Sequence, residues 1–247
     1  MSIDEIEFPV WRMFRPEHCA TLILTTLIIV LMARLARRSP DSVAVNRQTR
    51  ILAVILLLTY PVKLLGFWLA GYHTMYYWPW PMHLCDWAAY VCAIALLTRK
   101  RWLAEIGYFW GVGATMQGLI TPDLQFGFPH PVWFTFTHLH SGVVIAAFYL
   151  VCGLQLQPRR FGFVRAWAAL HVYLLVAYIV NTISGHNYGF LRAKPMAGSL
   201  MDILPPEPWH ILALEPVTIF VFLLCQIPFW FLGKKPEQSE TLSVATK

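Results

Sequence analysis

Long apolar runs alternate with short polar connections along the 247 residues of the chain. A helix needs about 20 apolar residues to cross the hydrocarbon core of a bilayer. Seven segments approach that length, and the third reaches it only with the aromatic residues before it. They cover residues 17–36, 50–70, 84–98, 103–120, 133–154, 164–182 and 209–232. The pattern predicts an all-α, polytopic membrane protein that folds as one bundle of seven transmembrane helices.

The two ends of the chain differ from this pattern. We expect an extracytoplasmic N-terminal segment over residues 1–16, a membrane domain over 17–232 and a disordered cytoplasmic tail over 233–247. The first residues are acidic and lack the basic region that opens a signal peptide, so the first apolar run is expected to stay as a helix.

Composition agrees with a membrane protein. Hydrophobic residues make up 57% of the chain and charged residues only 13%, whereas soluble domains carry about 25% charged residues. The net charge of +6 could suggest a nucleic-acid partner, but the basic residues stand in clusters between apolar runs. That distribution is typical of membrane topology, so we expect no nucleic-acid binding. The chain carries no signal of an oligomeric state.

The basic clusters occupy every second connection. Arginines crowd the first connection, between residues 34 and 50, and basic residues recur at 99–101, at 159–165 and in the tail. The connections between these are nearly free of lysine and arginine. Because cytoplasmic loops carry the excess of positive charge, the pattern places the N-terminus outside the cell and the C-terminus in the cytoplasm.

Polar, potentially reactive groups gather where the helices are expected to reach the outer side. The candidates for a site there are His83, Cys85, Asp86, Asp123, His138, His140, Asn187, Tyr188 and Asp202. His138 and His140 stand inside an apolar run, where an ionisable group is costly and usually functional. Since they are two residues apart, they point to roughly opposite sides of the helix, and only one of them can face the centre of the bundle.

A cysteine and a histidine within reach of each other form a nucleophile and its general base. Cys85 begins a helix, and a helix N-terminus favours the thiolate. We therefore predict that Cys85 attacks an acyl carbon with His140 as its base and His138 as the substitute candidate. His83, Asp86, Asp123, Asn187, Tyr188 and Asp202 would support the site or bind substrate. This chemistry needs no metal and no cofactor, and a membrane-lipid ester near the interface would suit it as substrate.

Two alternatives remain open at this point. Several histidines and aspartates at one depth could hold zinc, as in seven-helix membrane hydrolases. The bundle could also be a transporter or receptor with a polar outer pocket. Lys63, in the middle of the second predicted helix, could snorkel or pair with Glu105 or Glu215, and no chemistry is assigned to it.

The motifs "PMHLCDWAAY", "TPDLQFGFPHPVWF", "HSGVVIAAFYL" and "NYGFLRAKPMAGSLMDILPPEPWHIL" resemble the YwaF family of bacterial integral membrane proteins over roughly residues 50–232. That family is similar to a vertebrate transmembrane acyltransferase that acts on ether phospholipids. The resemblance implies a multi-pass protein of the cell (inner, plasma) membrane that transfers or hydrolyses acyl groups of phospholipids or lysophospholipids. It implies that Cys85 is the nucleophile and that His140 is the functional histidine of the "H-x-G" pattern.

Overall fold

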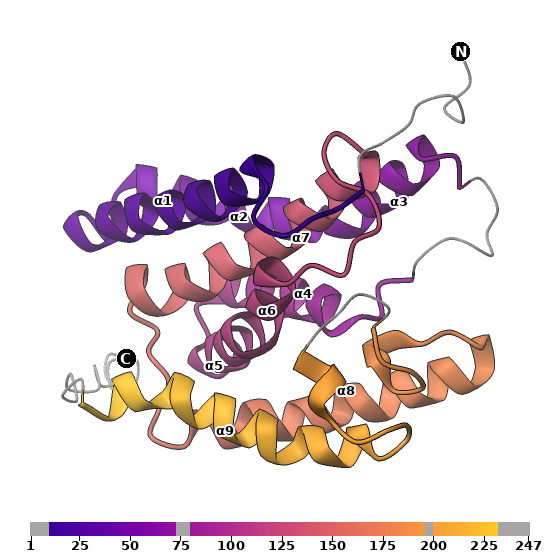
Figure 1. Ribbon diagram of the computed structural model, residues 1–247. Helices are drawn as coiled ribbons and strands as arrows, with labels where there is room; N and C mark the ends of the chain where they lie inside the picture. The colour runs from indigo at the N-terminus through magenta and orange to yellow at the C-terminus, as the bar shows by residue number, and fades with distance from the viewer. Residues whose placement is uncertain (1–9, 73–79, 196–199, 232–247) are drawn as a thin grey trace.

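The computed structural model describes residues 10–72, 80–195 and 200–231. Within these ranges the regular structure is helical, apart from an isolated bridge between Val10 and Phe126 (Figure 1). The all-α class is therefore confirmed. Most of the predicted N-terminal segment and the whole predicted tail, 233–247, lie outside the described residues.

Each predicted segment is occupied by helix. The α-helices are α1 (Pro16–Arg38), α2 (Val43–Leu57), α3 (Thr59–Leu69), α4 (Leu84–Thr98), α5 (Arg101–Trp110), α6 (Met116–Ile120), α7 (Pro131–Phe148), α8 (Gly162–Ser184) and α9 (His210–Phe231). Two π-helical turns, η3 (Gly111–Thr115) and η4 (Tyr149–Gly153), continue α5 into α6 and extend α7. Two 3₁₀ turns, η5 (Tyr188–Phe190) and η6 (Leu200–Ile203), lie between α8 and α9.

The second predicted helix differs most from expectation. It begins earlier, at Val43, because the Ser42 side chain caps it by accepting a hydrogen bond from Val45 N at 3.2 Å. It is also broken at Leu58, and α2 and α3 meet there at an angle of 47°. Pro61 lies one turn beyond the break, and a proline inside a helix removes a backbone hydrogen bond and bends the chain.

Four helices are long and apolar enough to cross a membrane: α1, α7 with η4, α8 and α9. The bent pair α2–α3 makes a fifth if it counts as one span, and α4 is a shorter apolar helix. The multi-pass membrane character is thus supported within the described ranges. Seven crossings and the orientation of the termini stay predictions.

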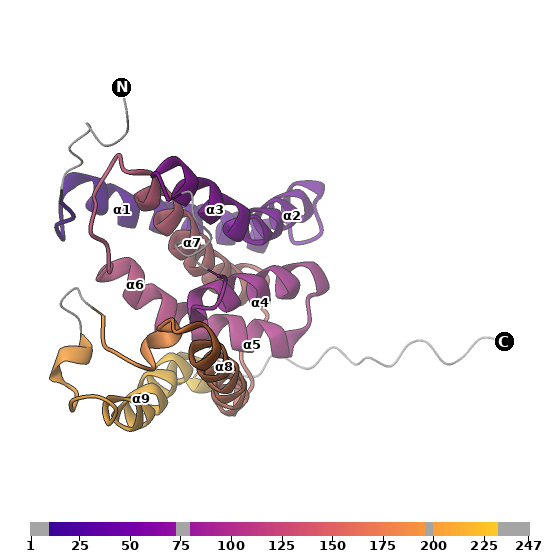
Figure 2. The same cartoon turned by 90° about the vertical axis from the view of Figure 1, so that its right-hand side faces the viewer.

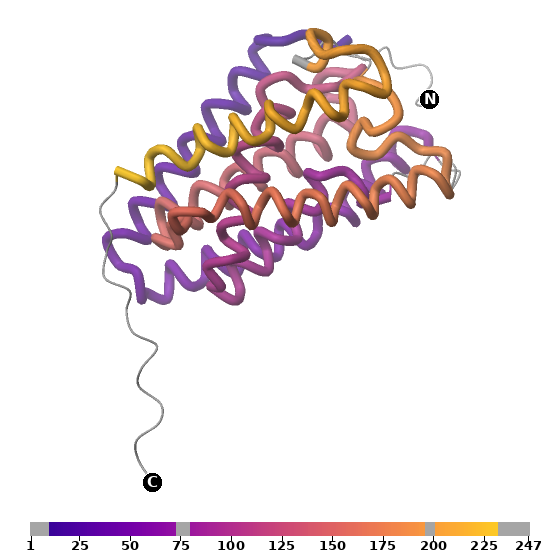
Figure 3. The backbone as a smooth tube through the Cα atoms, turned by 90° about the horizontal axis from the view of Figure 1, so that it is seen from below, coloured from indigo at the N-terminus to yellow at the C-terminus, as the bar shows by residue number. Residues whose placement is uncertain are grey.

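The connections gather at two ends of the bundle. At one end, the Arg37 guanidinium donates to the Cys152 carbonyl at 2.6 Å and Arg101 donates to Gln157 O at 2.7 Å. The end of α9 lies at the same end of the bundle as the turn between α1 and α2 (Figure 3). Arginines of the first two basic clusters, Arg37 and Arg101, therefore contact η4 and the connection that follows it.

Small residues bring α4 close to its neighbours at the centre (Figure 2). Ala88, Ala89, Cys92 and Ala93 are fully buried, and a Cβ on Gly107 of α5 would stand 2.8 Å from the Cys92 sulfur. Close backbone approach through small side chains is typical of packed membrane helices. In contrast, only 11% of the apolar window of α9 is buried inside the protein, against 67% for α7 with η4. The central helices α4 and α7 carry Cys85 and His140.

Candidate functional site

The first turn of α4 is the starting point of the site. His83 is the N-cap residue, and its backbone N–H donates to Asp86 Oδ2 at 3.1 Å. Asp86 is only 1% exposed, and its other oxygen, Oδ1, lies 2.5 Å from Lys63 Nζ of α3. An acidic side chain is favoured at this position by the unpaired N–H groups and the positive end of the helix dipole. Asp86 therefore holds the N-terminus of α4 in place and neutralises a buried lysine.

The partner of Lys63 corrects the pairings considered from the sequence. Glu105 instead binds the guanidinium groups of Arg159 and Arg165. Glu215 accepts a hydrogen bond from Trp167 at 3.0 Å, and the Nε2 atom of His171 lies 3.1 Å from its other oxygen. Lys63 of α3 pairs with Asp86 at the start of α4.

His140 is the histidine that faces the interior, where it is 7% exposed. Its Nδ1 lies 2.9 Å from the carbonyl oxygen of Phe136, and its ring stacks on the Phe136 ring at 3.8 Å. A carbonyl only accepts hydrogen bonds, so Nδ1 carries the proton of the neutral imidazole and Nε2 keeps its lone pair. The opposite edge of the ring lies against Gly118, where a Cβ would stand 2.9 Å from Nε2. The structure thus holds His140 in the tautomer that a general base needs.

Cys85 lies near the same stretch of chain as His140. Its thiol lies close to the hydroxyl of Thr115, but the two form no hydrogen bond, and the buried Thr115 Oγ1 has no hydrogen-bond partner in the described structure. Thr115 and Gly118 are three residues apart, which is roughly 4.5 Å along a helix axis. Both side chains therefore lie against the segment η3–α6, Cys85 near Thr115 and His140 near Gly118. We call this surface, formed by residues 115–118, the floor of the site.

Charged and phenolic groups lie in the surroundings of Asp86 and His140. His140 interacts electrostatically with Asp86, Lys63 and His83. Asp86 in turn interacts with four phenols, those of Tyr60, Tyr90, Tyr173 and Tyr188. Of the predicted site residues, His83, Asp86 and His140 thus lie near one another, and their role in a site stays a prediction.

The segment before α4, residues 80–82, is held by hydrogen bonds to residues from α8 and from the connection that follows α8. The Tyr173 hydroxyl donates to the Met82 carbonyl at 3.1 Å, and Trp80 N donates to the Tyr188 hydroxyl at 3.1 Å. Burial raises the pKa of the Tyr188 phenol, so this group stays protonated. Gly189 has a φ of +67°, and a Cβ there would stand 2.7 Å from the Tyr173 hydroxyl. Glycine is required at that position so that the connection can cover the start of α4.

Four predicted site residues have other surroundings. The imidazole of His138 lies beside the Ile55 carbonyl, with Nε2 at 3.2 Å, next to the bend between α2 and α3. Asn187 closes a turn, because its Oδ1 accepts from Arg192 N at 2.8 Å and its Nδ2 donates to Ala193 O at 2.8 Å. Asp123 and Asp202 are exposed, in the connection after α6 and in η6. The structure does not bring these four residues to the floor beneath Cys85.

No group of three or more histidine, cysteine or acidic side chains in the described part of the chain is arranged to hold a metal ion. A zinc site needs three or four such ligands. The zinc alternative therefore has no ligand set within those residues.

Sequence reasoning missed Lys63, Thr115, Gly118 and Tyr173 as members of the site. A lysine in an apolar run is itself a signal of function in a membrane protein. The stretch "GVGATMQG" carried a second signal, because three glycines in a membrane helix mark close approach of neighbouring groups. Which group approaches each glycine depends on the tertiary packing.

The comparisons with known proteins agree with this architecture. No curated protein and no solved structure matches the chain. The sequence model of the TMEM164 family matches residues 13–226, which include every helix of the site. The chain therefore belongs to the TMEM164 family of transmembrane proteins.

Proposed function

We propose that this protein is a membrane-embedded enzyme that moves acyl groups from phospholipids or lysophospholipids through a Cys85 thioester. The observation that carries the proposal is the state of His140, whose Nδ1–H is held by the Phe136 carbonyl and whose Nε2 faces the floor shared with Cys85. A histidine in a fixed tautomer with a free lone pair is suited to act as general base for a nearby cysteine, and Cys85 and His140 both lie by the segment η3–α6. The resemblance to a phospholipid acyltransferase supports the same reaction class.

The reaction needs only these two side chains and the lipid. His140 Nε2 takes the thiol proton, and the Cys85 sulfur attacks the carbonyl carbon of the ester. The C–O bond breaks, the leaving alkoxide takes the proton from the imidazolium, and a thioester remains on Cys85. Water or the hydroxyl of a second lipid then attacks the thioester, with His140 again as base, and the thiol is restored. In the described structure no hydrogen bond joins Cys85 to His140, and such catalytic bonds often tighten only when substrate is bound.

The start of α4 favours the charged form of Cys85, whereas the low exposure of the thiol to solvent opposes it. The positive end of the α4 dipole stabilises a thiolate at Cys85. The Lys63–Asp86 pair is neutral as a whole, so it orders the start of α4 without placing a net negative charge beside the thiolate. The outer helices α1, α8 and α9 present large apolar side chains to their surroundings, which is the environment from which a lipid substrate would enter.

The test is capture of the acyl-enzyme. Purified protein in detergent is incubated with a phospholipid that carries an alkyne-tagged acyl chain, and the hydroxylamine-sensitive label on the protein is quantified. We expect label on the wild-type protein, none on Cys85→Ala, and a loss of roughly 100-fold or more in the labelling rate for His140→Ala, as is typical for removal of a general base.

Two matched variants control this experiment. His138→Ala removes a histidine two residues away, and Cys92→Ser removes a cysteine two turns deeper in α4, so both should label within about twofold of wild type. Label that persists in Cys85→Ala, or equal loss in His138→Ala and His140→Ala, would contradict the proposed pair. A wild-type protein that binds the lipid but never acquires label would instead support the transporter or receptor alternative.

A further inference from the structure

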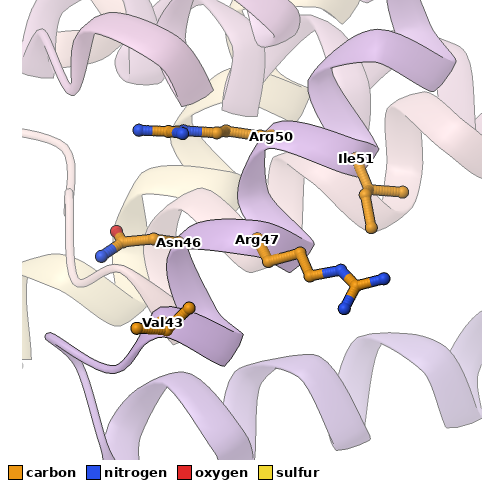
Figure 4. A pocket seen from close by; sticks show the side chains of 5 residues that line it. All are labelled: Val43, Asn46, Arg47, Arg50 and Ile51. Carbon is orange, nitrogen blue, oxygen red and sulfur yellow. The ribbon is translucent and has the colours of Figure 1, made fainter.

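A second candidate site lies at the basic end of the bundle, on the outward face of α2. A hollow of about 470 Å³ is lined there by Val43, Asn46, Arg47, Arg50 and Ile51 (Figure 4). This volume is within the range of roughly 300–1,000 Å³ that small-ligand sites occupy. The five residues fall on one helix face, at spacings of three and four, while Val45, Thr49 and Leu52 are buried on the opposite face.

The polar groups of this hollow are available to a ligand. Arg47, Arg50 and Asn46 are exposed, and none of their side chains has a partner within residues 10–72, 80–195 and 200–231. Figure 4 shows Arg47 and Arg50 extending to opposite flanks of the hollow, with Asn46 on the side of Arg50. An unpaired guanidinium group on each flank of the hollow offers an anionic group a fork of donors, while the surface of the hollow between them is apolar.

The same face of α2 becomes apolar immediately beyond the arginines. Ile51, Val54 and Ile55 follow on it and are 48%, 51% and 38% exposed. The change from guanidinium to aliphatic side chains along one helix face marks the boundary between head groups and hydrocarbon. A free anion would use only the first part of this surface, whereas a phospholipid would use both parts.

We propose that this face of α2 binds an anionic phospholipid, with the head group at the arginines that flank the hollow, Arg47 and Arg50, and an acyl chain along Ile51, Val54 and Ile55. Basic surfaces beside membrane helices recognise anionic head groups in this way. This site is separate from the proposed catalytic site. It lies at the basic end of the bundle, whereas Cys85 lies in the first turn of α4, at the opposite end. The inference does not depend on the proposed acyl transfer.

The test measures lipid binding to the purified full-length protein by native mass spectrometry. The protein is titrated with dioleoyl phosphatidylglycerol and, as a neutral reference, with dioleoyl phosphatidylcholine. We expect the anionic lipid to bind more tightly, and Arg47→Ala/Arg50→Ala to weaken it roughly thirtyfold, on the basis of the usual contribution of each interfacial arginine. Arg47→Gln/Arg50→Gln should weaken it equally while keeping side chains of hydrogen-bonding type.

A control of equal charge comes from α1. Arg34 and Arg38 are exposed, stand in the same basic cluster and have no partner among the described residues, so Arg34→Ala/Arg38→Ala should bind within about twofold of wild type. Equal weakening by both pairs would overturn the site in favour of general charge attraction. Equal affinity for the two lipids, or displacement of the lipid by inorganic phosphate alone, would also overturn it. Cys85→Ala should bind like wild type, which separates this site from the proposed substrate site.

Discussion

At the scale of single residues, the fixed state of His140 depends on two neighbours. The Phe136 carbonyl holds the Nδ1 proton, and the missing side chain of Gly118 leaves room for the other edge of the ring. Neither neighbour carries chemistry of its own. The reactivity of the candidate base therefore depends on the backbone oxygen of Phe136 and on the absence of a side chain at Gly118.

Gly118→Ala tests this arrangement. The new Cβ would stand 2.9 Å from Nε2 and Cδ2 of His140, closer than real Cβ contacts allow, so the imidazole must shift. We expect the labelling rate of Cys85 to fall by roughly tenfold, since misplacement of a catalytic group by about 1 Å costs up to a hundredfold. Gly142→Ala is the control, because its Cβ would meet only a methyl of Leu56 at 3.2 Å. Unchanged labelling in Gly118→Ala would mean that His140 is not positioned by this contact.

His130, outside the spans, supplies a prediction of pH dependence. It is the N-cap of α7, and its Nδ1 accepts a hydrogen bond from Val132 N at 3.2 Å. Burial lowers the pKa of His130 below its ordinary value of 6.5. The neutral imidazole is thus favoured by folding, and its contribution to stability is complete above pH 6.5. Below that pH the unfolded chain takes up a proton that the folded chain resists, so stability falls.

The measurement is the unfolding midpoint between pH 7.5 and pH 5.5 for wild type and His130→Asn. Asparagine is a strong N-cap without a titrating group. We expect the midpoint of the variant to fall less over this range than that of wild type. An identical fall in both proteins would show that His130 does not contribute to the pH dependence.

At the scale of elements, the bend between α2 and α3 is held from two sides. The His138 imidazole lies at the Ile55 carbonyl, and the Lys63–Asp86 pair ties α3 to the N-terminus of α4. Removal of one partner from a buried ion pair is costly because the other charge is left uncompensated. The bend is therefore stabilised by polar contacts on both faces of the broken helix.

A double-mutant cycle on Lys63 and Asp86 tests the second contact. Lys63→Met should destabilise the protein by about 3–5 kcal/mol, since it leaves the carboxylate of Asp86 buried and unpaired. Lys63→Met/Asp86→Asn should recover a large part of this loss, and thermal unfolding in detergent measures both. If the double variant is as unstable as the sum of the single variants, the two residues do not interact as a pair.

At the scale of the whole molecule, the two ends of the bundle differ in chemistry. One end gathers the basic connections, and the other carries the start of α4 with its fastening by Tyr173 and Tyr188. The proposed acyl-transfer site and the proposed anionic-lipid site therefore lie at opposite ends. If the charge rule holds, they face opposite leaflets.

Cysteine accessibility tests this orientation in intact cells. In a background without the native cysteines, Asp41→Cys at the basic end and Pro206→Cys before α9 are both exposed positions. We expect a membrane-impermeant maleimide to label Pro206→Cys in intact cells and Asp41→Cys only after permeabilisation. Labelling of both from outside would contradict the predicted topology.

The sequence by itself determined the helical class and most of the helix positions, and it predicts the alternation of the helices across the membrane. These features are local or additive: an apolar run of given length favours helix, and charge is counted loop by loop. The range 84–98 of α4 was predicted without error. The grouping of Cys85, Asp86 and His140 in one site was inferred from their expected common depth and stays a prediction.

Only the tertiary structure decided which groups meet. Lys63 pairs with Asp86 rather than with Glu105 or Glu215, which depends on where α3, bent by 47° from α2, lies in the bundle. His140 rather than His138 faces the interior because α7 is packed on α6 and α4 along that side, while His138 meets the backbone of α2. Pairings of this kind join residues far apart in the chain. They depend on helix rotation and bending, which periodicity and composition leave free because both describe each helix separately.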